Sequence, residues 1–462
     1  MNNKMNNLDF DLIKKYDRPG PRYTSYPTAP HFSENFDKDK FFAEIESANK
    51  RTHSNDLSLY FHLPYCDTLC YFCGCNMIVS NNRSRIGTYV DYIEKEVGLL
   101  KKYISHERKV SQLHWGGGTP THLKPDEIRE LGEVIHRNFD FRDDAEVSCE
   151  IDPRGMTEEH VIALKESGFN RVSMGVQDFD EKVQKAVNRI QPESITRQVV
   201  DWVRKHDFVS VNLDLMYGLP FQKVETFENT IDKIIDISPN RIAVFNYAHV
   251  PWLKKHMEMI KAEDLPAPET KLKLFKLSID KFSEAGYVFI GMDHFAKPDD
   301  ELTIALREKK LYRNFQGYST RSGTDLHALG ITGISQFGRV YSQNVKTEKE
   351  YYKLLDDETL PLFKGYYLND DDVIRREVIM RIMCDFELDF TKIEKQFNID
   401  FEEYFRWGLN NLKEMIDDGL VEIKNKKLVV NNTGRLLIRN VAMNFDGFIE
   451  RKEDNTRYSR TV

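Results

Sequence analysis

The sequence predicts an α/β protein with a partial (β/α)6 barrel, an irregular N-terminal segment and a mostly helical, winged-helix-like C-terminal domain. Two observations predict the barrel. Strand-like and helix-like segments alternate from about residue 56 to residue 250, and one face of the strand-like segments is repeatedly polar. Strands that alternate with helices indicate a parallel sheet made of βα units.

Six strand-like segments carry this rhythm, with helix-like segments filling the gaps between them. The strands are expected at 57–63, 110–115, 146–151, 171–176, 210–216 and 241–247. The helices are expected at 87–105, 125–138, 157–167, 192–205 and 224–237.

The alternation of side chains within these strands favours a barrel. Apolar residues alternate with Tyr60 and His62 in the first strand, with Glu150 in the third and with Asp214 in the fifth. An open parallel sheet that is covered on both faces usually has continuous apolar strands. A barrel with a polar, ligand-filled lumen explains the polar face better. A doubly wound sheet with a few satisfied polar residues remains the alternative.

Three domains are expected along the chain. Residues 1–50 form a proline-punctuated segment that covers the substrate, with a short helix near 38–50. Residues 51–365 form the barrel domain, which includes a strand at 287–293 and a polar loop at 293–317. Residues 366–462 form the C-terminal domain. Its expected order is three helices, two strands and a helix, at 371–383, 391–397, 401–418, 421–424, 428–431 and 433–448.

Composition excludes several classes of protein. The 462 residues can bury a large core, which excludes a small disulfide-stapled scaffold. The net charge of −8 argues against nucleic-acid binding through bulk positive charge. We expect no transmembrane helix, because no apolar run reaches about 18 residues. The chain starts without an apolar signal region, so the expected location is the cytoplasm.

The six cysteines are unevenly distributed, and this distribution indicates a metal site. Four lie between Cys66 and Cys75, on the loop after the first strand, whereas Cys149 and Cys384 are expected to be core thiols. Ligands gather at the carboxyl ends of barrel strands. Close thiolates favour zinc or an iron–sulfur cluster, but structural zinc usually needs a second ligand pair that this chain lacks. Three cysteines can hold three irons of a [4Fe–4S] cluster and leave the fourth iron open.

The spacing Cys66-x3-Cys70-x2-Cys73 resembles that of radical S-adenosylmethionine (radical SAM) enzymes. The longer string at 60–76 resembles the oxygen-independent coproporphyrinogen III oxidases, also called coproporphyrinogen dehydrogenases. Cys75 favours these oxidases over haem-chaperone relatives, which usually carry Phe there. Further matches follow in order at 21–28, 114–121, 175–179, 187–189, 293–296, 313–318, 435–440 and near 458–460.

The resemblance implies a radical SAM barrel and a specific reaction. The reaction is the anaerobic oxidative decarboxylation of two propionate side chains of coproporphyrinogen III to vinyl groups, giving protoporphyrinogen IX in haem biosynthesis. A SAM-derived 5′-deoxyadenosyl radical starts it by taking a hydrogen from a propionate β-carbon. The implied cofactors are a [4Fe–4S] cluster and two SAM molecules per active site. The expected partners are an electron donor for the cluster and an unidentified electron acceptor, and the expected state is a monomer that binds no nucleic acid.

The resemblance also assigns roles to residues. Cys66, Cys70 and Cys73 would ligate the cluster, while Cys75, Tyr60 and His62 are candidate catalytic residues. The first SAM is matched by Tyr60, Gly117, Glu150 and Ile334. The second SAM is matched by Phe72, Gly118, Thr119, Gln177, Arg189, Asp214 and Ala248.

A substrate with four propionates should be recognised by arginine, because a guanidinium pairs with a carboxylate through two hydrogen bonds. The candidates are Arg22, Arg313 and the family-matched Gln316, followed by Arg18 and Arg460.

Three other functions remain open at this point. The first is a haem chaperone or a haem-degrading relative within the radical SAM group. The second is a winged-helix DNA-binding regulator that uses a modest basic patch of Lys424, Lys426, Lys427, Arg435 and Arg439. The third is a protein with structural zinc.

Overall fold

The computed structural model describes residues 9–50, 56–453 and 458–461. The chain divides into two compact units. The barrel unit comprises Phe32–Lys271 and Gly323–Tyr367, and the terminal unit comprises Met1–His31, Leu272–Ser322 and Leu368–Val462. The three-part division expected from the sequence stays a prediction.

Six parallel strands form the main part of the barrel unit. They are β1 (Leu57–Leu63), β4 (Val110–Gly117), β5 (Phe141–Ile151), β6 (Arg171–Gln177), β7 (Ser210–Tyr217) and β8 (Arg241–Asn246), side by side in sequence order. A doubly wound sheet reverses its strand order at a switch point, and this one does not. The partial barrel is therefore confirmed and the doubly wound alternative is wrong.

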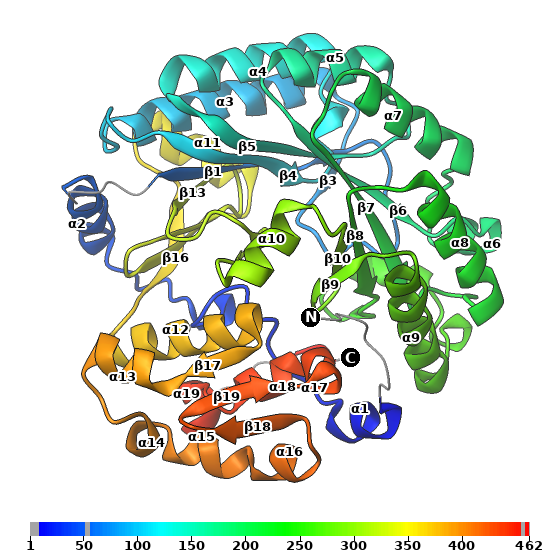
Figure 1. Cartoon of the computed structure of the whole chain (residues 1–462). Helices are drawn as coiled ribbons and strands as arrows, with labels where there is room; N and C mark the ends of the chain where they lie inside the picture. Colours follow the sequence, from blue (N-terminus) through cyan, green and yellow to red (C-terminus); the bar gives the residue numbers. More distant parts are fainter. Residues whose placement is uncertain (1–8, 51–55, 454–457, 462) are drawn as a thin grey trace. The chain divides into compact units, whose positions relative to one another are not determined.

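Helices connect these strands and cover their outer face (Figure 1). They are α3 (Arg83–Lys101), α4 (Pro125–Asn138), α5 (Glu158–Glu166), α6 (Glu181–Ala186), α7 (Glu193–Lys205) and α8 (Val224–Ile237), with the 3-10 turns η2 (Pro120–His122), η3 (Lys255–Met259) and η4 (Ala262–Asp264). The sequence did not predict α6, and it placed α3 four residues too late.

The alternating pattern of the strands has the expected structural basis. On β7 the apolar residues Val211 and Leu213 are buried, while the intervening Asn212 is only half-buried. The polar side chains of neighbouring strands bind one another. Asn212 donates to Ser173 Oγ at 2.9 Å, and Ser58 donates to Gln112 at 3.0 Å. The polar face thus contains hydrogen bonds that run across the strands, in which these four side chains find partners.

The sheet continues beyond β1 with strands that the sequence did not predict. β13 (Asp325–Leu329) pairs with β1 in parallel, followed by the antiparallel strands β14 (Ile334–Phe337), β15 (Val340–Asn344) and β16 (Leu362–Tyr367). The remaining elements of this unit are α2 (Lys38–Asn49), α11 (Glu348–Asp356) and the short pair β2 (Tyr65–Cys66) and β3 (Ile78–Val79).

The terminal unit takes elements from three parts of the chain. Its first two parts hold α1 (Phe10–Tyr16), η1 (Ala29–His31), β9 (Val288–Gly291), β10 (His294–Ala296), α10 (Glu301–Glu308), β11 (Tyr312–Asn314) and β12 (Gly317–Ser319), while α9 (Pro268–Glu284) crosses the boundary between the units. The expected polar loop at 293–317 is wrong, because it contains β10, α10 and β11. Asp300 caps α10 by accepting a hydrogen bond from the Leu302 N–H at 2.8 Å.

The C-terminal part has more and shorter helices than expected. They are α12 (Asp370–Asp385), α13 (Phe390–Phe397), α14 (Phe401–Tyr404), α15 (Arg406–Asn411), α16 (Lys413–Asp417), α17 (Asn432–Leu436), α18 (Ile438–Met443) and α19 (Gly447–Glu450). The strands β17 (Glu387–Asp389), β18 (Val421–Lys424) and β19 (Lys427–Val430) form an antiparallel sheet in the order β17-β19-β18. The single helices expected at 401–418 and 433–448 are wrong, since each is a series of short helices.

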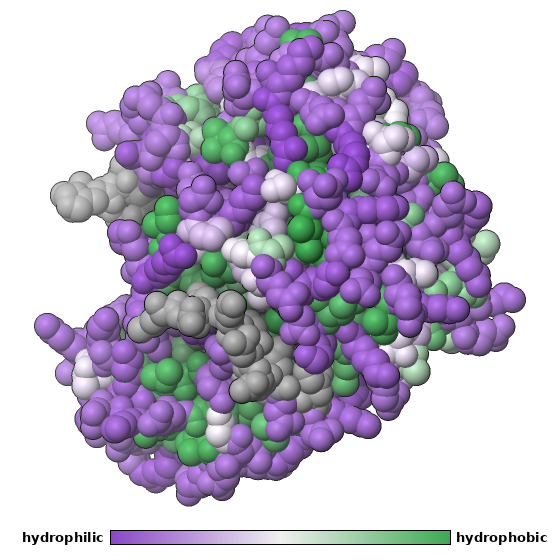
Figure 2. Space-filling view, turned by 45° about the vertical axis from the view of Figure 1, so that its right-hand side comes forward, coloured by the Kyte–Doolittle hydropathy of each residue, from purple (hydrophilic) through white to green (hydrophobic). Residues whose placement is uncertain are grey.

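The residues buried in the core and those exposed on the surface are of the kinds that the composition leads us to expect there. Cys149 and Cys384 have no exposed surface, so both are core thiols as expected. Hydrophilic side chains predominate on the face that Figure 2 shows. Within the described ranges, no helix is both long enough and apolar enough to cross a membrane.

Candidate active site

The cysteine loop leaves the carboxyl end of β1 and is fixed by backbone hydrogen bonds. The Ile78 N–H donates to Pro64 O at 2.7 Å, and the Ser80 N–H donates to Cys66 O at 3.0 Å. Cys70 is buried, Cys66 and Cys73 are half-buried, and Cys75 is exposed. The loop therefore presents four thiols in unlike surroundings.

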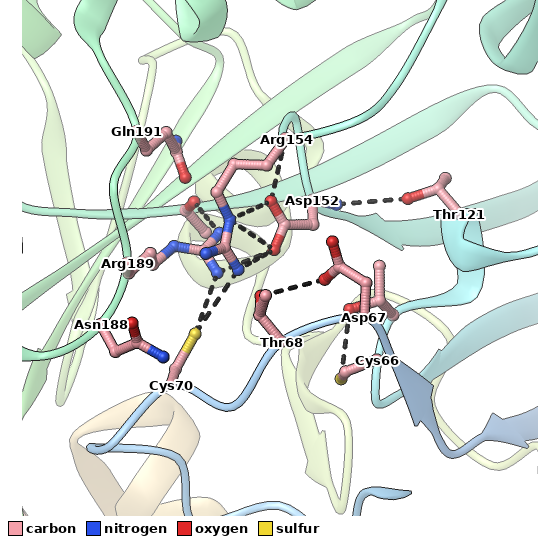
Figure 3. A network of polar contacts seen from close by, with 12 residues as sticks. Cys66, Asp67, Thr68, Cys70, Thr121, Asp152, Arg154, Asn188, Arg189 and Gln191 are labelled. Atoms are coloured by element: carbon pink, nitrogen blue, oxygen red, sulfur yellow. Dashed lines mark hydrogen bonds and ion pairs between the residues drawn. The ribbon is translucent and has the colours of Figure 1, made fainter. Parts of the chain in front are cut away.

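Polar groups from other elements surround two of these sulfurs. Thr119 Oγ1 donates to Cys66 Sγ at 3.4 Å. Two guanidiniums donate to Cys70 Sγ, Arg154 through Nη2 at 3.5 Å and Arg189 through Nη1 at 3.7 Å (Figure 3). Among the cysteine sulfurs of the described loop, that of Cys70 therefore has the most positive surroundings.

Asp152 holds both of these arginines in place. Its Oδ2 accepts from Arg154 Nη2 at 2.7 Å and from Arg189 Nη1 at 2.9 Å, as Figure 3 shows. Burial alone would raise the pKa of Asp152, but the two arginines outweigh it and hold that pKa below its usual range. The carboxylate therefore stays ionised and compensates one of the two positive charges beside Cys70.

The thiols differ in acidity. The Cys75 thiol donates to Cys73 and lowers the pKa of Cys73 to about 6. Burial raises the pKa of Cys66 to about 12, against the opposing effect of the Thr119 hydroxyl. Of Cys66 and Cys73, Cys73 is therefore the more readily ionised.

The fit of this loop to a metal centre depends on which centre is considered. Among the described residues, no three His, Cys, Asp or Glu side chains are grouped closely enough to hold one metal ion. A [4Fe–4S] cluster requires no such convergence, because each cysteine binds a different iron. Three neighbouring thiols, two of which accept hydrogen bonds from N–H or O–H donors, suit that cluster better than a zinc ion.

The glycine-rich loop after β4 lies directly against the cysteine loop. The Gly118 N–H donates to Leu63 O and the Thr119 N–H donates to Tyr65 O, both at 2.8 Å. A Cβ on Gly118 would stand 2.3 Å from Pro64 O, and Gly117 has a φ of +119°. Both positions therefore require glycine, for close approach and for backbone conformation respectively.

A polar group on β1, β4 and β5 occupies the lumen face near these loops. The Tyr60 hydroxyl lies 3.2 Å from His62 Nδ1, and the Tyr60 ring stacks on His114. His114 Nε2 lies 3.4 Å from Glu150 Oε1, and the Gly117 N–H donates to Glu150 Oε2 at 3.1 Å. Burial would raise the pKa of Glu150, but His114 and the Gly117 N–H hold it below its usual range. Glu150 is therefore anionic at neutral pH.

Asp214 on β7 differs from Glu150 in its protonation. It accepts hydrogen bonds from Asn212 Nδ2 at 2.6 Å and from Ser173 Oγ at 3.3 Å. Burial and the nearby Glu150 charge nevertheless raise the pKa of Asp214 to about 7. Asp214 therefore exchanges its proton near neutral pH.

The remaining residues expected to bind SAM are spread over the same unit. Gln177 ends β6 with a φ of +69°, and its Oε1 has no hydrogen-bond partner among the described residues. Phe72 packs on a buried apolar cluster that includes Val187. Ala248 follows β8 and is exposed, while Ile334 begins β14.

The residues expected to bind substrate lie in the terminal unit. Arg22 forms an ion pair with Asp293, while Arg313 is buried with its guanidinium over the Tyr318 ring. Gln316 lies in the turn between β11 and β12. The two further candidates are exposed. Arg460 pairs with Asp17, and Arg18 is hydrogen-bonded to Thr461 through its backbone N–H and C=O.

The sequence analysis missed four residues around the cysteine loop. Arg154, Lys254 and His256 bind it directly, through Cys70 Sγ, Cys75 O at 2.7 Å and Cys73 O at 2.8 Å respectively, and Asp152 acts through Arg154. Asp152 follows Glu150 by two residues on the same polar face, so the pattern could have identified it. No sequence signal marks Lys254 or His256, because the chain folding alone brings their loop to the cysteines.

Comparisons with known proteins agree with the site described above and extend over nearly the whole chain. Residues 60–234 match the model of the Radical SAM superfamily, and residues 368–437 match that of the HemN C-terminal domain. The oxygen-independent coproporphyrinogen III oxidase of Escherichia coli is 45% identical over 98% of both chains. The Synechocystis protein of that name is 44% identical over 98% of this chain and 97% of its own.

The solved structures include one that this chain matches over nearly its full length. It is described as "Coproporphyrinogen III oxidase (HemN) from Escherichia coli is a Radical SAM enzyme". The TM-score is 0.91 at 44% identity, covering 96% of this chain and 99% of the other. Membership of the superfamily implies a [4Fe–4S] cluster and SAM as cofactors. The chain belongs to the oxygen-independent coproporphyrinogen III oxidase family of radical SAM enzymes.

Proposed function

We propose that the chain is an oxygen-independent coproporphyrinogen III oxidase. It converts two propionate side chains of coproporphyrinogen III to vinyl groups, with loss of carbon dioxide, and forms protoporphyrinogen IX in haem biosynthesis. The observation that carries this proposal is the identity of 44–45% over almost the full length with curated enzymes of that name. The cysteine loop at the carboxyl end of β1 supports it independently, because that end of a barrel is where ligands gather.

The proposed cofactor sites lie within the barrel unit. Cys66, Cys70 and Cys73 hold the [4Fe–4S] cluster. When bound, the cluster and SAM supply the 5′-deoxyadenosyl radical that takes a hydrogen from the propionate. The first SAM is assigned to Tyr60, Gly117, Glu150 and Ile334, and the second to Phe72, Gly118, Thr119, Gln177, Arg189, Asp214 and Ala248.

The charges of two carboxylates support these assignments. Glu150 is anionic at neutral pH and can accept hydrogen bonds from an ammonium group or a ribose hydroxyl. Asp214 has a pKa raised to about 7, so a cationic ligand nearby would favour its ionised form.

Tyr60 and His62 are proposed to hold a proton near the reaction. His62 Nε2 lies 2.8 Å from Asn76 O, which can only accept, so Nε2 carries the proton and Nδ1 accepts from the Tyr60 hydroxyl. Burial raises the pKa of Tyr60 and lowers the pKa of His62, so both are neutral at pH 7. Cys75 is the third candidate catalytic residue, because its exposed thiol lies beside Cys73.

The remaining parts of the proposal concern partners and location. The reaction requires an electron donor for the cluster and an acceptor for the electron released with carbon dioxide. We place the protein in the cytoplasm as a monomer.

The DNA-binding alternative loses its support in the terminal unit. Arg439 is buried and donates to backbone carbonyls, while Lys426 pairs with Glu394 and Lys427 with Glu387. Three of the five residues of the basic patch are therefore engaged within the protein. A haem chaperone is the second candidate, and it would bind haem without turning over a porphyrinogen.

An anaerobic assay tests the proposed function directly. Reconstituted protein is incubated with SAM, a reductant and coproporphyrinogen III, and the products are separated by chromatography. We expect both 5′-deoxyadenosine and protoporphyrinogen IX. If neither forms while the cluster is intact, the proposed function is wrong, and haem binding by the same preparation would then favour the chaperone.

The variant Cys70→Ala belongs to the same experiment. We expect it to lose the cluster and the activity but to keep its far-ultraviolet circular dichroism, since the barrel core does not depend on the metal. Cys149→Ala, which removes a core thiol, is the matched control and should retain iron. Unfolding of Cys70→Ala, or zinc in place of iron, would mean that the metal is structural.

A further inference from the structure

Arg313 on β11 is a buried arginine that forms no ion pair with any of the described residues. Only 3% of its surface is exposed, and neither Nε nor Nη1 has a hydrogen-bond partner among the described residues. Its recorded contact is with an aromatic ring, as the guanidinium carbon lies 4.8 Å from the centre of Tyr318. The Tyr318 hydroxyl donates to Met383 O at 3.1 Å and forms no hydrogen bond with Arg313.

The surroundings of Arg313 carry an excess of positive charge. Arg313 and Arg22 both act electrostatically on Arg439 and on Tyr318, and the carboxylate that acts on both of these groups is Asp293. Asp293 is already paired with Arg22. Burial and the repulsion from Arg22 and Arg313 lower the pKa of Arg439 to about 10. Three guanidiniums therefore share one carboxylate.

Arg439 has a structural explanation that Arg313 lacks. Its Nε donates to Pro21 O at 2.8 Å, and its Nη1 donates to Arg460 O at 3.1 Å. These hydrogen bonds fix the first and last parts of the chain to α18. The Arg313 guanidinium makes no comparable bond within the described part of the chain, although an unpaired buried charge is strongly destabilising. A group of that kind is retained where a ligand supplies the missing charge.

A second donor in the same hairpin is also unused. Gln316 lies in the turn between β11 and β12, and its Nε2 is buried without a partner among the described residues. A guanidinium fork and an amide N–H are both donors that match a carboxylate. Donor chemistry and charge thus both indicate an anionic ligand with a planar acceptor group.

We propose that the β11–β12 hairpin forms a carboxylate-binding site in which Arg313 is the principal residue and Gln316 an additional donor. The identity of the carboxylate rests on the proposed function, which makes it one of the substrate's four propionates. The Tyr318 ring supports the guanidinium from one side and leaves its N–H edge for the ligand. Arg22 adds to the positive field and is neutralised in part by Asp293.

The proposal predicts that replacing Arg313 weakens ligand binding but does not destabilise the ligand-free protein. Arg313→Met removes an unpaired buried charge and retains an apolar side chain of similar length. We therefore expect the melting temperature of the ligand-free protein to stay the same or rise. Binding of coproporphyrin III, the stable oxidised form with four carboxylates, should weaken about tenfold or more as measured by its fluorescence. Arg313→Lys should lose less, because it retains the charge but not the fork.

Two controls accompany these variants. Arg406→Met makes the same substitution at an exposed arginine in the same unit, and it should change neither quantity. Iron content and SAM cleavage should be equal in all the proteins. A lower melting temperature with unchanged coproporphyrin binding in Arg313→Met would show a structural arginine and overturn the proposal.

A second ligand separates this proposal from the proposed function. Glutarate, at constant ionic strength with chloride as reference, should raise the melting temperature of the wild type but not that of Arg313→Met. That result would support the carboxylate site even if the anaerobic assay gave no protoporphyrinogen IX. Equal glutarate effects in both proteins would overturn the site even if turnover of coproporphyrinogen III were observed.

Discussion

At the scale of single residues, the contacts of two guanidiniums with Cys70 have the clearest chemical consequence. Arg154 and Arg189 donate to the same sulfur, while Asp152 supplies one negative charge to the pair. Hydrogen bonds to cluster sulfurs and positive charge nearby both stabilise the reduced cluster, and so raise its reduction potential. Burial strengthens this effect, because water does not screen it.

Replacing Arg154 by methionine tests this effect. The variant removes the hydrogen bond to Cys70 and leaves Asp152 to neutralise Arg189 alone. We expect a more negative midpoint potential of the reconstituted cluster, measured by an anaerobic redox titration followed by electron paramagnetic resonance. Arg197→Met, which replaces a partly exposed arginine on α7, is the control and should keep the wild-type potential. Equal potentials in all three proteins would show that these contacts do not tune the cluster.

The sequence revealed only part of this arrangement. The spacing of Cys66, Cys70 and Cys73 predicts a common ligand role, which stays a prediction, and it could be read from the sequence because spacing on one loop is a local property. The contacts of Arg154 and Arg189 could not be predicted, since they join the cysteine loop to segments 84 and 119 residues further along the chain. Such contacts are set by the closure of the barrel.

At the scale of elements, two glycines test how closely the loops of the barrel approach each other. A Cβ on Gly118 would stand 2.3 Å from Pro64 O, whereas a Cβ on Gly87, inside α3, would meet nothing within 4 Å. Gly118→Ala should therefore separate the glycine-rich loop from the cysteine loop, at a cost of about 1–3 kcal/mol. Gly87→Ala should stabilise α3 by up to about 1 kcal/mol, because alanine favours helix.

Thermal unfolding and iron content after reconstitution measure both effects. We expect Gly118→Ala to melt at a lower temperature and to retain less iron, and Gly87→Ala to melt slightly higher with full iron. The opposite order of the two melting temperatures would contradict the close approach. Because both variants add the same methyl group, composition cannot explain a difference between them.

Elements were predictable where their pattern is local and regular. The six parallel strands and the helix α4 follow from alternation and helical periodicity over many residues. The short helices α14 to α19 depend instead on close packing between distant segments. Gly408, for example, faces Asn444 O so closely that a Cβ would stand 2.2 Å away. Periodicity alone joined these helices into longer ones, because it contains no information on such contacts.

The dependence of stability on pH is a property of the whole molecule, and one buried carboxyl makes a large contribution to it. Glu96 on α3 is 3% exposed and accepts hydrogen bonds from the Gly330 N–H at 2.7 Å and from Asn344 Nδ2 at 2.8 Å. The Tyr351 hydroxyl is a third donor. Burial outweighs these bonds and raises the pKa of Glu96 from 4.5 to about 7.

The sign of the effect follows from proton linkage. Between pH 4.5 and about 7 the folded state holds a proton on Glu96 that the unfolded chain has lost. Stability therefore falls as the pH rises through this window, by about 3 kcal/mol in total, and the loss is complete above it. Asp214, with a pKa raised to about 7, acts in the same direction.

Glu96→Gln isolates this contribution. Glutamine imitates the protonated carboxyl, so the variant should show a flatter profile of melting temperature against pH between about 5 and 8, with its largest gain over the wild type at the alkaline end. Glu94→Gln, two residues away on an exposed part of α3, should follow the wild-type profile. Parallel profiles for wild type and Glu96→Gln would mean that Glu96 is ionised throughout the range. The three hydrogen bonds explain why this costly group is present, since Gly330 begins the turn that leads into Ile334 and the proposed SAM site, and Asn344 on β15 donates to Gly330 O.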